Sequence, residues 1–320
     1  MFRLALGVAV LAFLGHGVGH AAEQEVPVAA RALLGTWKQE KTNRTNIIRF
    51  EPERFVQLLD GRLRFERVRY RPGKREAETI VVRRGDPRAE PLATVELKDG
   101  ALSVSSPQGP RAFKRLDRVP AELEPRPLPL GKPVAVAADK ARAVKTDLAR
   151  REKANLKVRF ELRELKKPDE RAAKIKEMLK IDEDDTRYLV GLIKEVGWID
   201  SRRFGDAAAH SAYLIAMHTH DFSLMLTAVR EIEREVKAGR FDAESWAGLH
   251  DRYRVVTGQR ERFGHHVFAN RKGELVIGPL EDRKKVNQFR KEFGLPTLAE
   301  YLARHREANG GKDVQIVDDD

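Results

Sequence analysis

The 320-residue sequence predicts an α+β fold, in which a small antiparallel β barrel or sandwich precedes a mainly α-helical domain with one short hairpin. Short runs of alternating polarity with Asp-Gly turns occupy residues 31–118, which indicates β structure. A proline-rich stretch follows at 119–137, and apolar residues then recur at helical spacing over 138–308. The chain is also longer than one small core needs, which favours two domains.

Composition limits the chemistry that the chain can perform. The sequence contains no cysteine, which excludes disulfides, thiolate metal sites, a cysteine nucleophile and an acylated lipoprotein cysteine. Histidine, carboxylate and hydroxyl chemistry remain. Lys+Arg 61 against Asp+Glu 49 gives a net charge of +12, which suits acidic surfaces. Basic residues alternate with acidic ones along the predicted helices, so we expect no nucleic-acid partner.

Residues 1–22 have the layout of a secretory signal peptide. Arg3 precedes an apolar run from Leu4 to Leu14, and small residues lead to Ala21-Ala22, where cleavage is expected. An uncleaved membrane anchor is the alternative, but the run is shorter than the roughly 20 residues that span a bilayer. We therefore expect a periplasmic or secreted protein with no transmembrane segment after signal removal.

The β region is clearest at a hairpin between Ala93–Leu97 and Leu102–Ser105, where Asp99-Gly100 supplies the turn. The region opens with Gly35-Thr36-Trp37-Lys38, which resembles the start of lipocalin-like domains. This resemblance implies that Trp37 closes one end of a barrel. An open interior with a ligand is one outcome, and we expect the other, a packed small barrel.

Five prolines between Pro120 and Pro133 predict a stiff extended linker at 119–137. Beyond it we expect a charged helix over 138–166, a second helix opened by Pro168, and another helix containing the stripe from Leu189 to Val196. Further helices follow, with a hairpin at 267–277 and two last helices around 284–292 and 297–306. The polar segment 309–320 is predicted to be a disordered acidic tail.

Six histidines fall within one window of the helical region: His210, His218, His220, His250, His265 and His266. Metal binding would need His218 at a helix end with His265 or His266 brought in from a later loop. Helical geometry opposes nearer pairs, because His218 and His220 would diverge by about 200° and His210 lies about 12 Å from His218 along a helix. We therefore expect polar surface or packing roles for these histidines, and neither a metal site nor a cofactor.

Two other features carry little chemistry by themselves. Asp251-Arg252 is an adjacent pair of opposite charges that diverge on a helix, which is typical of a solvated face. Ser211 does not lie in a Gly-x-Ser-x-Gly nucleophile context, and the sequence contains no phosphate-binding glycine loop.

The helical half resembles a bacterial family of unknown function, number 6624. The resemblance rests on Gly197-Trp198-Ile199, Phe204-Gly205-Asp206, Ala212–His218, Asp251-Arg252, Phe263-Gly264-His265-His266 and Gly294-Leu295-Pro296-Thr297-Leu298. It covers about residues 146–302. The chain departs from the family pattern at Met217, His220 and His266, where the family has glutamine, an acidic residue and glutamine, and it lacks an Asp-Gln near Asn155.

The resemblance supplies candidate site residues and no reaction. His218, Asp251 and Arg252 are the catalytic candidates, and Gly264, His265, His266 and Gln259 are the binding candidates. We expect an exported envelope protein that binds a ligand or partner without catalysis, the partner being an anionic envelope component or a small ligand. The alternative is an exported hydrolase, in which His218 is the general acid or base, Asp251 orients it and Arg252 holds an anionic group.

Overall fold

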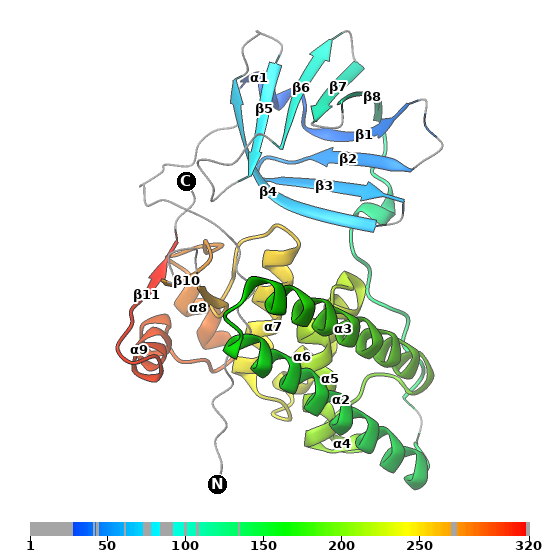
Figure 1. The fold of residues 1–320 in the computed structure, drawn as a ribbon, viewed down its shortest axis with the longest axis vertical. Helices are drawn as coiled ribbons and strands as arrows, with labels where there is room; N and C mark the ends of the chain where they lie inside the picture. Colours follow the sequence, from blue (N-terminus) through cyan, green and yellow to red (C-terminus); the bar gives the residue numbers. More distant parts are fainter. Residues whose placement is uncertain are drawn as a thin grey trace. The chain divides into compact units, whose positions relative to one another are not determined.

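The computed structural model describes residues 28–317, apart from 41, 43–44, 61, 73–77, 84–91, 99–100, 107–108, 134 and 270–273 (Figure 1). The predicted signal peptide lies outside these described residues. The chain forms two compact units. The barrel unit comprises Met1–Glu124, Arg254–Arg290 and Pro296–Asp320, and the helical unit comprises Pro125–Tyr253 and Lys291–Leu295. An antiparallel barrel precedes a mainly helical region, so the predicted α+β class is confirmed.

A short helix, α1 (Val28–Arg31), precedes a closed barrel in which each strand pairs antiparallel with the next and β1 pairs with β8. The strands are β1 (Gly35–Gln39), β2 (Asn46–Phe50), β3 (Arg54–Leu59), β4 (Arg62–Pro72), β5 (Glu78–Arg83), β6 (Ala93–Lys98), β7 (Ala101–Ser106) and β8 (Gly109–Leu116). The predicted hairpin is β6 and β7, with Val95 opposite Val104. Closure leaves no unpaired sheet edge between first and last strand.

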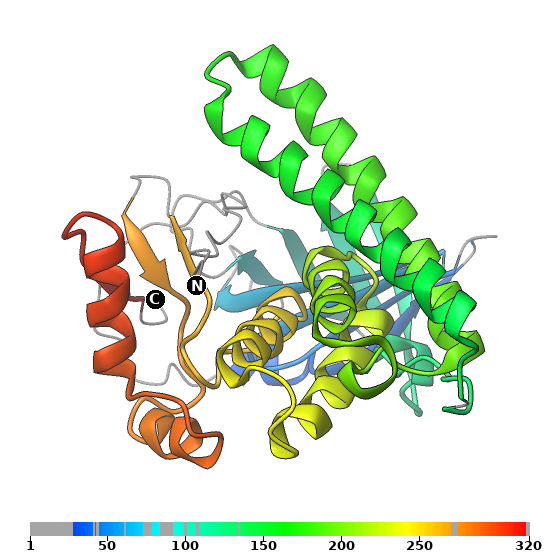
Figure 2. The same cartoon turned by 90° about the horizontal axis from the view of Figure 1, so that it is seen from below.

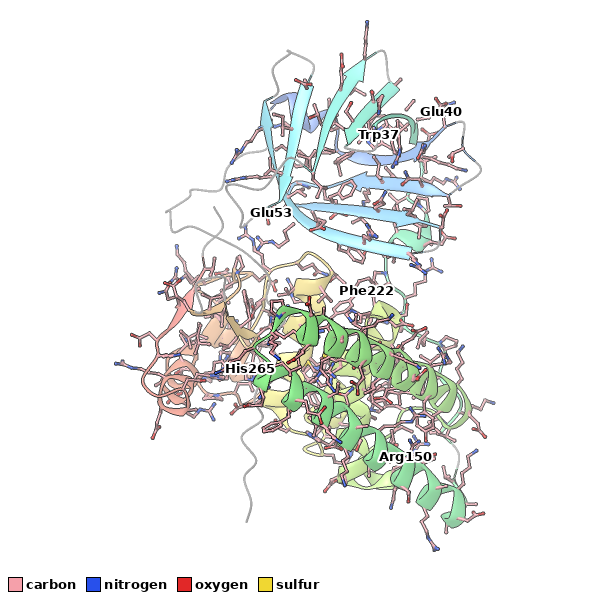
Figure 3. The ribbon with its side chains drawn as sticks, viewed as in Figure 1. Trp37, Glu40, Glu53, Arg150, Phe222 and His265 are labelled. Carbon is pink, nitrogen blue, oxygen red and sulfur yellow. The ribbon has the colours of Figure 1, made fainter. Side chains whose placement is uncertain are left out.

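Apolar side chains fill the barrel interior. Its core includes Trp37, Phe50, Tyr70 and Phe113 (Figure 3). Trp37 is fully buried, and its Nε1 donates to the Leu33 carbonyl at 2.9 Å. Trp37 is therefore a residue of the barrel core.

A second apolar cluster covers the outer side of β2, β3 and β4. Ile47, Val56 and Leu58 pack there with Leu123 of the short 3-10 helix η1 (Ala121–Leu123). The first residues of the predicted linker thus belong to the barrel's packing, because Leu123 is fully buried.

The C-terminal part of the barrel unit is a small sheet with two helices. It contains β9 (Val267–Ala269), β10 (Leu275–Ile277), α8 (Val286–Glu292) and α9 (Leu298–Ala308). The prediction of a disordered tail from residue 309 is wrong where the tail is described, because β11 (Val314–Ile316) pairs parallel with β10. Val314 and Ile316 supply apolar side chains that pack against the core of this sheet. This packing explains why a segment with polar flanking residues forms a strand.

The helical unit begins with an antiparallel pair, α2 (Ala138–Glu164) and α3 (Pro168–Val196) (Figure 2). Two predicted helices in the region of α3 are one continuous helix. Pro168 lies in its first turn, where a missing N–H is tolerated, and Gly197 ends it with a φ of 76°. No described helix combines the length and apolarity needed to cross a bilayer.

Four further helices complete the unit: α4 (Ser201–Phe204), α5 (Asp206–His218), α6 (Phe222–Lys237) and α7 (Ala243–Val256). α5 is buried along most of its length because small and apolar residues cover its circumference. Trp246 of α7 is buried, donates to the Val229 carbonyl of α6 at 2.9 Å and packs on Phe293 at 4.3 Å. These contacts hold α7, which carries part of the candidate site, against α6.

Candidate anion-binding site

Polar side chains join α2 to α3 in the middle of the helical unit. Nη2 of Arg159 donates to both carboxylate oxygens of Asp182, at 2.9 and 2.8 Å. Asn155 donates to Asp182 at 2.9 Å and accepts from Nη1 of Arg159 at 2.8 Å. Two turns earlier on α2, Arg151 donates to Asp185 at 2.8 Å. Each of these arginines therefore has its own aspartate.

Arg252 on α7 has no such partner. Its side chain is buried, with only 9% of the residue exposed, and its Nε has no hydrogen-bond partner. Within the part of the chain that the structure describes, the guanidinium makes no hydrogen bond or ion pair. Burial, followed by the positive charge of Arg159, lowers the pKa of Arg252 to about 10. A buried cation without a counter-ion is costly, by several kcal/mol.

Elements distant in sequence converge on Arg252. The charges that act on it are those of Arg159 from α2, Asp182 from α3 and Tyr213 from α5. Asp182 is already engaged by Arg159. Tyr213 is buried, and that burial raises the pKa of its hydroxyl, so it remains neutral. The cluster of Arg159, Arg252 and Asp182 therefore carries a net positive charge.

His218 is the last residue of α5 and faces the same cluster. Its position is fixed by the next residue, because Thr219 shares a 2.8 Å hydrogen bond with Thr186 of α3. Burial lowers the pKa of His218 well below its usual range, and the charges of Arg159 and Arg252 lower it further. His218 is partly exposed, yet its Nδ1 is buried without a hydrogen-bond partner. At neutral pH this ring is an uncharged group that can donate from one nitrogen and accept at the other.

His220 lies beside this cluster and is more exposed than His218. Partial burial and then the charge of Arg252 lower its pKa, while Asp182 raises it. Both histidines therefore add polar groups without adding positive charge at neutral pH.

The hypothesis that Asp251 orients His218 has no support in the geometry. Asp251 is fully buried, and its Oδ1 lies 3.3 Å from Nδ1 of the adjacent His250. Within the described residues Nδ1 of His218 has no hydrogen-bond partner, so none of their carboxylates holds the ring through that nitrogen in the manner of a catalytic dyad. The structure brings His218 and Arg252 to one cluster and gives Asp251 a separate neighbour.

The four binding candidates belong to the barrel unit, where they make local contacts. Gln259 donates to Thr257 at 3.0 Å, and the His265 ring stacks on Tyr301 at 4.2 Å. The backbone N–H of His266 donates to the buried carboxylate of Glu261 at 3.0 Å. These contacts support the folding of the segment before β9.

Gly264 has a φ of +62°, and a Cβ there would lie 3.1 Å from side-chain carbons of Leu280 and Leu298. The space above its backbone is thus occupied by the core of the small sheet. The glycine is required for packing, and a close approach of its backbone to a ligand would need that core to move.

Among the described residues, no three His, Asp or Glu side chains are grouped so that they could hold a metal ion.

The sequence did not lead us to expect that Arg151, Asn155, Asp182 and Asp185 are partners in a buried network. The spacing of these residues hints at the network, because Arg151, Asn155 and Arg159 recur every four residues and Asp182 and Asp185 are three apart. Such spacings place them on one stripe of each helix, which is also what a solvated face would show.

Fold and site together define a two-unit α+β protein whose helical unit contains a buried, positively charged cluster. Residues 143–314, more than half of the chain, match the model of the Family of unknown function (DUF6624). The chain belongs to this family, which confirms the resemblance drawn from its motifs. No curated protein and no solved structure matches the chain.

Proposed function

We propose that the helical unit binds a small anion, a carboxylate or a phosphate group, at Arg252. The observation that carries this proposal is a guanidinium that is nine-tenths buried and has no counter-ion in the described chain. Proteins retain buried cations mainly where a partner compensates the charge. A bound anion would be that partner.

Each group near Arg252 has a distinct role in this proposal. The guanidinium offers two parallel N–H donors that match the oxygens of a carboxylate or phosphate. Arg159 remains bound to Asp182 and acts on the anion through its charge. His218, uncharged at neutral pH, adds one short-range hydrogen bond at the partly exposed side of the cluster.

Binding without catalysis is favoured over hydrolysis. A histidine base is normally held by a second group, whereas Nδ1 of His218 has no partner. The hydroxyl of Ser211, which donates to Glu152 at 2.5 Å, is only 2% exposed, so a substrate would not reach it as a nucleophile. The proposal therefore assigns the helical unit to ligand binding.

Export is part of the same proposal. It is supported by the signal-like residues 1–22, which combine Arg3 with an apolar run and small residues. The lipocalin-like assignment of the barrel is likewise proposed, supported by Gly35-Thr36-Trp37 on β1 of a closed barrel. N-terminal sequencing of protein from fractionated cells should give a chain that begins after Ala21 or Ala22. A chain that retains Met1 and stays in the cytoplasm would contradict export.

Anion binding is tested by thermal unfolding of the full chain at constant ionic strength, with phosphate or acetate replacing chloride. We expect the Tm of the wild type to rise with anion concentration, because only native-state binding stabilises. Arg252→Gln should lose this response. Arg150→Gln is the matched control, because Arg150 lies on the exposed side of α2 (Figure 3) with 66% of its side chain accessible. Equal stabilisation of wild type and Arg252→Gln would contradict the proposal.

A further inference from the structure

Exposed apolar side chains gather on the α2–α3 hairpin. Of the five large apolar residues that are exposed in the described chain, four lie on these two helices: Leu156 (45%) and Phe160 (65%) on α2, and Ile175 (38%) and Leu179 (43%) on α3. Single exposed apolar residues need no explanation, whereas a contiguous group of them marks a contact surface.

These four side chains lie on one face of the hairpin. The seam between the helices is marked by Asn155 and Arg159 on α2 and by the buried Met178 on α3. Leu156 and Phe160 follow their seam residues by one position, and Leu179 follows Met178. In an antiparallel pair, this step of about 100° turns both helices toward the same side. Ile175 is one turn from Leu179, so all four form what we call the apolar shelf.

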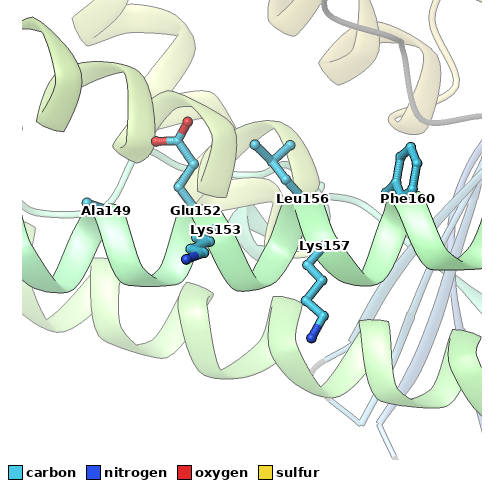
Figure 4. Close-up of a pocket in the computed structure, with 6 residues that line it drawn as sticks. All are labelled: Ala149, Glu152, Lys153, Leu156, Lys157 and Phe160. Carbon is cyan, nitrogen blue, oxygen red and sulfur yellow. The ribbon is translucent and has the colours of Figure 1, made fainter.

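The shelf and the proposed anion site are linked through α2. Phe160 is next in sequence to Arg159, whose charge acts on both Arg252 and His218. A hollow of about 590 Å³ lies along this part of α2, lined by Ala149, Glu152, Lys153, Leu156, Lys157 and Phe160. Glu152, Leu156 and Phe160 point to one side of the helix, and Lys157 points away from them (Figure 4). Arg159, whose charge acts on Arg252 of α7, and the exposed Phe160 are therefore neighbours on α2.

We propose that the anion site and the apolar shelf together bind a monomeric long-chain carboxylate. This inference rests on the proposed function and names the class of ligand for the same site. The carboxylate would reach Arg252 and His218, and the alkyl chain would cover Leu156, Phe160, Ile175 and Leu179. A carboxylate suits the site because Arg252 is only 9% exposed, so the head group must be small. The net charge of +12 would make a second copy of this chain repel the first, so a second copy is a poorer occupant than a small carboxylate.

The test is calorimetric titration with acetate, octanoate and dodecanoate below their micelle concentrations, at one pH and ionic strength. For the wild type we expect Kd to fall by about twofold per added methylene. Full burial of the alkyl chain would lower Kd more steeply, but the shelf is open on one side. The double variant Leu156→Ser with Phe160→Ser should bind acetate as the wild type does, with little dependence on chain length. Val119→Ser, which alters an exposed valine in the barrel unit (50%), should keep the wild-type dependence.

The outcomes separate the two proposals. If acetate binds through Arg252 and longer carboxylates bind no more tightly, the shelf is not part of the site and only this inference is overturned. If neither acetate nor the longer carboxylates bind, the proposed function fails as well. Dodecanoate that binds equally well to Arg252→Gln, or binding confined to vesicles of anionic lipid, would also overturn a monomeric carboxylate as the ligand. Phe160→Leu provides a second variant that retains an apolar surface, and its Kd should still depend on alkyl-chain length nearly as in the wild type.

Discussion

Arg159 and Arg252 are both about nine-tenths buried in the same helical unit, yet they differ in what surrounds the guanidinium. Arg159 is bonded to both oxygens of Asp182, whereas Arg252 makes no hydrogen bond or ion pair in the described chain. The first arrangement stabilises the α2–α3 pair. The second arrangement opposes folding, and the proposed anion would compensate the buried charge.

We therefore expect removal of the charge to change the free energy of unfolding differently at the two arginines. Arg159→Gln should reduce the free energy of unfolding by about 3–5 kcal/mol, because it leaves Asp182 buried without its cation. Arg252→Gln should leave the anion-free protein within about 1 kcal/mol of the wild type, or more stable, because it removes an unpaired buried charge. Urea unfolding in chloride buffer measures both. A loss for Arg252→Gln as large as that for Arg159→Gln would show that Arg252 is structural.

His218 predicts a pH dependence of stability. Its pKa is depressed in the folded state by burial and by the charges of Arg159 and Arg252. Below pH 6.5 the unfolded chain takes up a proton at this histidine and the folded chain does not, so stability falls as the pH is lowered. His218→Gln should lessen this decline between pH 6.5 and 5 by at most about 1.4 kcal/mol per pH unit. Identical pH profiles for variant and wild type would contradict a depressed pKa.

At the scale of single elements, the segment before β9 is held by packing. Gly264 has a φ of +62°, and a Cβ added there would lie 3.1–3.2 Å from side-chain carbons of Ile277, Leu280 and Leu298. Gly264→Ala introduces a Cβ that is disfavoured at this φ and is crowded by those side chains.

We expect Gly264→Ala to lower the free energy of unfolding by about 2 kcal/mol or more. Anion binding at Arg252 should be unchanged in molecules that remain folded. Denaturant unfolding and phosphate titration of the same preparation measure both quantities. A variant of native stability that no longer binds phosphate would make Gly264 a ligand-binding residue after all.

The elements that local patterns define were predicted well, and those that depend on distant partners were not. Alternating strands around Asp99-Gly100 and the stripe from Leu189 to Val196 were sufficient to place β6, β7 and the end of α3. β11 was missed because its two apolar residues gain a partner only from β10. Arg159 was read as part of a charged helix, since a sequence does not show that Asp182 comes to face it. Of the site, His218 and Arg252 could be nominated from family motifs, but the missing counter-ion is visible only in three dimensions.

At the scale of the whole molecule, the chain consists of two compact units, and the apolar clusters around Trp37 and around Ile277 both belong to the barrel unit. The barrel unit is packed around Trp37, and the proposed ligand site lies wholly within the helical unit. A ligand at Arg252 should therefore stabilise one unit directly.

Calorimetric unfolding should resolve two transitions, because two compact units of one chain need not unfold together. Phosphate should raise the midpoint of the transition that belongs to the helical unit, and Trp37→Phe should lower the midpoint of the other. Unfolding in a single transition that both changes shift equally would show that the two units fold as one.

The most direct test of anion binding in the helical unit is the NMR signal of Arg252 itself. In ¹⁵N-labelled protein, its Nε–H resonance is assigned by its absence from Arg252→Gln and followed during titration with phosphate and with acetate at constant ionic strength. We predict a saturable shift of this resonance and slower exchange of its proton with water, while the exposed Arg150 changes little. An Arg252 resonance that does not move, or moves only as much as that of Arg150, would contradict an anion-binding site in the helical unit.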